Sequence, residues 1–187
     1  GTDAELVPAN GASQVIEISD NLGTRKLQWQ FASRSQCRIC HTPWTGETNG
    51  FVEAQLRDPS NLPDAWHKLI EGGWVIADDS PSPLDDTHYS ALVNPLDASQ
   101  PLDRRARSYL HTNCSHCHMN GGNASTVFEV QFDKPLADSK IRTKPMRGDF
   151  GLSDAEIIKP GLPTQSILLL RMAKSGSGRM PHVGSQF

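Results

Sequence analysis

The chain has 187 residues, including 15 Gly and 13 Pro, and 36% of its residues are hydrophobic. This length fits one domain or two small ones and excludes a large multidomain enzyme, while the low apolar content indicates that something besides its own side chains completes the core. The formal net charge of −3 disfavours nucleic acid as a partner, and the longest apolar runs, residues 74–77 and 167–170, are far too short to span a membrane.

The N-terminal part of the chain predicts a β-hairpin followed by short helices. Residues 14–18 and 26–31 alternate apolar and polar side chains and indicate two strands, with turn residues at 20–23 between them. Residues 51–56 and 64–70 have the pattern of two short helices, and a Gly-Gly pair ends the second.

The C-terminal part predicts three helices after an acidic, Pro-rich loop or linker at residues 78–86. Residues 102–113 show helical spacing, and this helix runs directly into Cys114. Ser153–Glu156 forms a capping-box pattern that predicts a short helix, and a more apolar helix follows over residues 164–172.

All four cysteines fall in two pentapeptides of the form Cys-x-x-Cys-His, which we call the first motif (Cys37–His41) and the second motif (Cys114–His118). Two thiols three residues apart on a helical turn can add to the two vinyl groups of one haem, and the next histidine then lies under the iron as a proximal ligand. We therefore predict two covalently attached haems c. The residues that hold them are Cys37, Cys40, His41, Cys114, Cys117 and His118, with His41 and His118 binding iron.

Two other interpretations of the cysteines are weaker. Four thiolates could bind one zinc ion, but 73 residues separate Cys40 from Cys114, and zinc gives no reason for a histidine after each pair. Disulfide or thioredoxin-like chemistry is disfavoured because no βαβ pattern surrounds either pair, and no cysteine is left over for a disulfide.

Three segments resemble a family of bacterial di-haem c-type cytochromes: residues 31–41, 105–118 and 171–181. The order of helix, Cys-x-x-Cys-His, loop, apolar helix and Met-Pro loop is similar to a class I cytochrome c. The resemblance implies a mainly α, cytochrome c-like fold with an N-terminal β-hairpin and many loops. We expect residues 1–100 to carry the hairpin and the first haem and residues 101–187 to surround the second, unless both halves form one integrated unit.

The sixth iron ligands are predicted separately for the two haems. Met180 lies in a loop beside a proline, as expected of the distal ligand in a class I domain, and is assigned to the second haem. No methionine lies between the two motifs, so a methionine ligand of the first haem would come from the second half of the chain. The candidates for that position are Met172, Met146, His67 and His88, or the iron is open.

These features imply an electron-transfer di-haem cytochrome c in the periplasm or outside the cell, because thioether bonds to haem are made on the outer side of the inner membrane. Its expected partners are a donor and an acceptor redox protein, with no nucleic acid and no membrane span. The alternative is a small peroxidase-like redox enzyme with an open or displaceable ligand at the first haem. A third interpretation is a haem-bearing module of a larger secreted protein, since the ends at Gly1 and Phe187 fit a domain cut from a longer chain.

Overall fold

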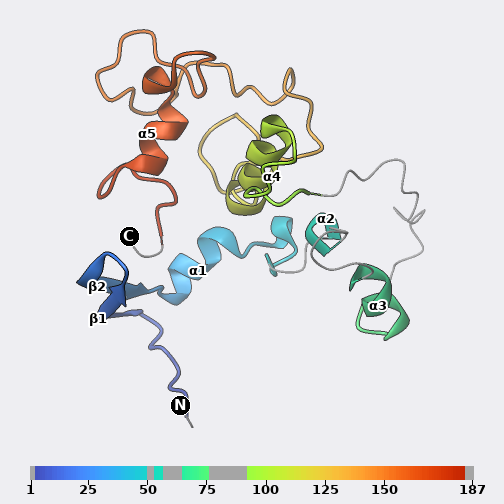
Figure 1. The fold of residues 1–187 in the computed structure, drawn as a ribbon, viewed down its shortest axis with the longest axis vertical. Coiled ribbons are helices and arrows are strands. Elements are labelled where there is room, and N and C mark those ends of the chain that lie inside the picture. The colour runs from blue at the N-terminus through green and yellow to red at the C-terminus, as the bar shows by residue number, and fades with distance from the viewer. Residues whose placement is uncertain (1–2, 50–52, 57–64, 76–91, 184–187) are drawn as a thin grey trace. The chain divides into compact units, whose positions relative to one another are not determined.

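The structure is a computed structural model that describes residues 3–49, 53–56, 65–75 and 92–183 (Figure 1). The chain divides into two compact units, which we call unit 1 (residues 1–42 and 141–187) and unit 2 (residues 43–140). These units cut the chain at other positions than the predicted segments 1–100 and 101–187. The assignment of one haem to each of those segments stays a prediction.

The predicted hairpin is present in unit 1, where β1 (Ala12–Asp20) and β2 (Gly23–Phe31) pair as a two-stranded antiparallel sheet (Figure 1). A carboxylate oxygen of Asp20 accepts the Leu22 N–H at 2.9 Å and closes the two-residue loop. Gly23 follows with φ 115°, a backbone conformation that favours glycine. The alternating apolar residues lie on one half-buried face: Ile16, Ile18, Leu27, Trp29 and Phe31.

The first motif lies on α1 (Arg34–Cys40), which follows β2 directly. Ser33 is the N-cap: its hydroxyl accepts the N–H of Gln36 at 3.2 Å, and the Gln36 side chain accepts the N–H of Ser33 at 2.9 Å. This capping box satisfies two N–H groups that have no partner within the helix. It therefore fixes where α1 begins, and the first motif follows within this helix.

The rest of unit 1 contains the short 3₁₀-helix η2 (Pro163–Gln165) and α5 (Ile167–Ala173). Ser166 is the N-cap residue of α5, so this helix begins later than the predicted 164–172. Ile141 and Ile167 are buried, with 5% and 2% of their surfaces exposed, and form part of the core of this unit.

The helix predicted to begin at Ser153–Glu156 is wrong. Residues 153–154 form a turn instead, and Glu156 makes an isolated bridge with Ser166. Ile157 donates its N–H to the carbonyl of Thr143 at 2.8 Å, and Ile167 donates to the carbonyl of Glu156 at 2.9 Å. Ile157 is buried between these two segments. The capping-box pattern is local, whereas pairing with distant segments satisfies the same backbone groups and buries an isoleucine, so tertiary pairing prevails.

Unit 2 contains the 3₁₀-helix η1 (Pro43–Thr45) and three helices, α2 (Glu53–Leu56), α3 (Ala65–Glu71) and α4 (Leu102–Cys114). The Gly-Gly pair ends α3 as predicted: Gly72 donates its N–H to the carbonyl of Lys68, and the next glycine has φ 69°. Residues 78–86, predicted as an acidic linker, lie outside the described residues.

Polar side chains of the helix α4 bind the backbone of neighbouring segments. The hydroxyl of Ser108, which is 1% exposed, accepts the N–H of Val93 at 3.0 Å. A guanidinium nitrogen of Arg107 donates to the carbonyls of Phe132 and Lys134, both at 2.5 Å. Segments that precede and follow α4 in the sequence are therefore held against this helix. Cys114 is its last residue, as predicted.

The prediction of a mainly α, cytochrome c-like fold is contradicted. Of the described residues, 28% are helical, in five short helices, and apart from α4 none exceeds seven residues. Helices of this length are marginal unless packing supports them. In the described part of the chain, the buried hydrophobic residues are Leu92, Val130, Ile141, Ala155, Ile157 and Ile167. So small a core supports few helices, and Gly- and Pro-rich loops fill much of the remainder. Among the described residues, no helix is long and apolar enough to cross a membrane.

Candidate functional site

The first motif occupies the last turn of α1. Cys37 is exposed and Cys40 is half-buried, and neither forms a disulfide. The N–H of His41 donates to the carbonyl of Cys37 at 2.9 Å, and His41 is the exposed C-cap residue of the helix. The two cysteines therefore lie on consecutive turns of one helix face, and the histidine follows where the chain leaves the helix.

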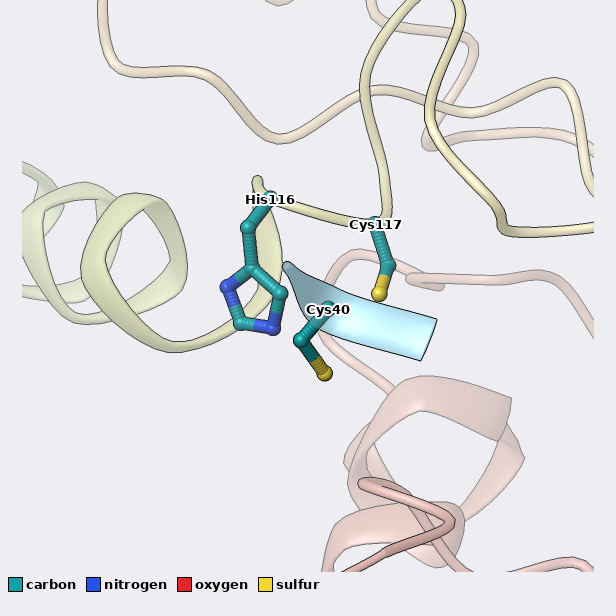
Figure 2. A group of neighbouring side chains, drawn as sticks. All are labelled: Cys40, His116 and Cys117. Atoms are coloured by element: carbon teal, nitrogen blue, oxygen red, sulfur yellow. The ribbon is translucent and has the colours of Figure 1, made fainter. Parts of the chain in front are cut away.

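The second motif begins at the last residue of α4 and continues as a helical turn. The N–H groups of Cys117 and His118 both donate to the carbonyl of Cys114, at 3.1 and 2.9 Å. Cys114 and Cys117 are half-buried and form no disulfide, and burial raises the pKa of Cys114 to about 11. The side chains of His116 and Cys117 extend from this turn, whereas Cys40, drawn with them, belongs to the first motif (Figure 2).

A returning segment, which we call the cradle (residues 124–130), encloses the second motif. Within it, Ala124 donates its N–H to the carbonyl of Cys117 at 3.2 Å, and Val130 donates to the carbonyl of His118 at 3.0 Å. His118 is 8% exposed, and this burial distinguishes it from the exposed His41. Two hydrogen bonds thus join the backbone of Cys117 and His118 to the cradle.

Two cradle side chains contact the His118 ring. The Thr126 hydroxyl oxygen lies 3.3 Å from Nδ1, and the Phe128 ring stacks on the imidazole with a centroid distance of 4.2 Å and an interplanar angle of 22°. Sequence reasoning missed both residues. The apolar alternation of Phe128, Val130 and Phe132 is the signal that could have indicated an extended segment returning to the motif.

Each unit also contains a cavity beside one of the motifs. A cavity of about 210 Å³ in unit 2 is lined by Trp44, His111, Ser115, His116 and Met119, among others. A cavity of about 420 Å³ in unit 1 is lined by Gln36, the residue before Cys37, and by Arg179 and His182 on either side of Met180. The residue that precedes the first motif and two neighbours of Met180 therefore line the same cavity.

The residues predicted as sixth ligands are placed as follows. Met146, Met172 and Met180 all belong to unit 1, together with the first motif. Met146 and Met172 are 63% and 38% exposed, and Met180 is half-buried. His67 belongs to α3, but its side chain is not described, and His88 lies outside the described residues. The assignment of each ligand to an iron stays a prediction.

Comparison of the chain with protein-family models, with curated proteins and with solved structures gives no significant match. The interpretation of the site depends on the two motifs themselves. Each offers two thiols one helical turn apart and an imidazole next to them, a donor set suited to covalent haem attachment with axial iron ligation.

Proposed function

We propose that the protein is a c-type cytochrome that attaches two haems covalently and transfers electrons. The observation that carries this proposal is that two segments far apart in the sequence fold alike. In each, the histidine N–H donates to the carbonyl of the first cysteine at 2.9 Å, between His41 and Cys37 and between His118 and Cys114. A thioether pair requires this spacing of thiols on one turn, whereas a lone Cys-x-x-Cys pair has no need of the histidine.

The surroundings of the motifs also fit a large apolar group. Trp44, beside the second motif's cavity, is 70% exposed, and Leu102 and Tyr109 on α4 are 74% and 41% exposed. Exposed large apolar side chains often mark ligand-binding surfaces. A macrocycle with two apolar faces would cover side chains of this kind and enlarge the small core.

The Cys114 thiol is poorly suited to redox chemistry of its own. The nucleophilic form of a cysteine is the thiolate, and reactive Cys-x-x-Cys pairs lower the pKa of one thiol. Burial does the opposite for Cys114, whose pKa of about 11 keeps it protonated at neutral pH. This supports a structural role as a covalent anchor over a thioredoxin-like role.

The roles of the residues follow from this assignment. A bound haem supplies one-electron chemistry at its iron. Cys37, Cys40, Cys114 and Cys117 would anchor the two macrocycles, and His41 and His118 would each hold one iron from the proximal side. The donor and acceptor would be other redox proteins, and the chemistry of thioether formation favours the periplasm or the cell exterior. The resemblance of the sequence to bacterial di-haem cytochromes supports the same function.

A peroxidase-like redox enzyme is the second candidate, and the exposure of His41 is the observation that favours it. An exposed proximal histidine is compatible with a first haem that solvent and small molecules can reach. Hydrogen peroxide turnover by the haem-loaded protein, abolished by Cys37→Ala with Cys40→Ala, would favour this function over electron transfer alone.

The main experiment counts haems by mass spectrometry of the denatured protein after expression with the cytochrome c maturation machinery. We expect the polypeptide plus two haems, and plus one haem when either motif loses both cysteines to alanine. Ile39→Ala changes a variable (x) position of the first motif. It is the matched control and should retain both haems. A chain that carries zinc and no haem would refute the proposal.

A further inference from the structure

The His118 ring is held on two sides by the cradle. The Phe128 ring stacks on its face at 4.2 Å, and the Thr126 hydroxyl lies 3.3 Å from Nδ1, at the long end of hydrogen-bond distances. Both residues come from one segment whose backbone is fixed to the second motif by Val130 and Ala124. The stacking restrains the tilt of the ring, and the hydroxyl restrains its rotation about χ2.

The Thr126 hydroxyl lies beside Nδ1, one of the two nitrogens of the His118 ring. A histidine that binds iron through Nε2 must carry its proton on Nδ1, and metal-bound histidines generally donate that proton to an oxygen. The Thr126 oxygen is on the Nδ1 side of His118. The hydroxyl can donate to Nδ1 or accept from it, so it is placed to accept the Nδ1–H that a histidine bound to iron through Nε2 would carry.

We propose that Thr126 is the positioning residue of the second haem, accepting the Nδ1–H of His118 and directing Nε2 to the iron. This inference rests on the proposed function and deepens it, because it assigns a residue that would tune one iron without binding it. An acceptor at Nδ1 increases the basicity of the imidazole, which stabilises the oxidised iron and lowers the reduction potential.

Thr126 could instead serve only to pack the cradle. Its side chain is half-buried, and the backbone bonds of the cradle do not involve its hydroxyl. Thr126→Val keeps the size and branching of the side chain and removes the acceptor, whereas Thr126→Ser keeps the hydroxyl. A packing role predicts that the serine variant is the more disturbed, and a positioning role predicts that the valine variant is.

The test is a redox titration of the holoprotein, followed optically, with haem stoichiometry measured first by mass spectrometry. Thr126→Val should raise the potential of one haem and leave the other unchanged. We expect about a tenfold change in the equilibrium constant for reduction, the lower end of outer-shell effects, which is about 59 mV for one electron. Thr126→Ser should keep the wild-type reduction potential. Ser125→Ala, at the exposed neighbouring residue, should keep it too.

The outcomes separate this inference from the proposed function. A wild-type chain without haem would overturn both. Two haems with potentials that Thr126→Val does not change, or changes equally at both irons, would overturn the role of Thr126 alone. A shift of one potential that Thr126→Ser does not reverse would assign the effect to packing and would also overturn it.

Discussion

Gly122 is the position at which the structure makes its sharpest steric prediction. A Cβ atom placed there would lie 2.2 Å from the carbonyl oxygen and 2.8 Å from the carbonyl carbon of Cys117. Both are backbone atoms of the second motif, so they can only move together with the chain. Gly122→Ala should therefore displace the motif or the start of the cradle by about 1 Å.

The expected cost follows from what this displacement disturbs. Inserting a methyl group into a site without room costs about 1–3 kcal/mol, and weakening the bond from the Ala124 N–H to the Cys117 carbonyl adds about 1 kcal/mol. We expect Gly122→Ala to lower the free energy of unfolding by about 2–4 kcal/mol. It should also reduce the haem content at the second motif, because His118 and Cys117 lie on the displaced turn.

Gly72→Ala is the matched control. Neither glycine has a positive φ. The atoms nearest to a new Cβ at Gly72 are the Lys68 carbonyl oxygen at 3.0 Å, which needs to shift by only a few tenths of an ångström, and the Trp74 ring at 2.7 Å. That ring is 83% exposed and can turn away. We expect a change below about 1 kcal/mol, with both haems retained. Urea unfolding followed by circular dichroism measures both variants, and equal losses of stability would refute the steric argument.

Three further predictions concern the ligands, the pH dependence and α4. Met180→Ala should remove the methionine–iron absorption band of one haem and lower its potential by on the order of 100 mV, within the roughly 0.8 V that axial ligands span. Repeating the substitution in chains that keep the cysteines of one motif only identifies the haem, and an unchanged spectrum makes Met180 a packing residue. His111 accepts the Phe132 N–H at Nδ1, and burial lowers its pKa from 6.5, so the unfolded chain takes up a proton at a higher pH than the folded one. The stability contributed by His111 should be complete above pH 6.5 and fall as the pH drops towards the lowered pKa. A His111→Gln variant whose urea midpoints fall with pH as steeply as those of the wild-type chain would contradict this. Ser108→Ala removes the acceptor of the Val93 N–H in a buried site and should cost about 1–3 kcal/mol in thermal unfolding, against little change for the exposed Ser125→Ala.

Local signals predicted those parts of the fold that depend on local interactions. The hairpin follows from alternation and a short turn, and α4 follows from helical spacing that continues into Cys114. The helix from Ser153 failed because its capping pattern competes with pairing between Ile157 and Thr143, which are too far apart to be joined by a helical hydrogen bond. The mainly α prediction failed because it depended on a resemblance carried by three short segments, and irregular loops fill much of the described chain between them.

The same distinction applies to the site. The positions of the thiols and of the two motif histidines follow from five-residue motifs, and the structure gives both motifs the same backbone hydrogen bond. The surroundings of His118 do not follow from its motif, because Thr126 and Phe128 contact it across eight and ten residues of irregular loop. A pentapeptide can specify that a haem is attached, but the environment of the histidine sets how its iron behaves. In the proposed cytochrome, Thr126 and Phe128 would therefore influence the potential of the haem at the second motif without binding its iron.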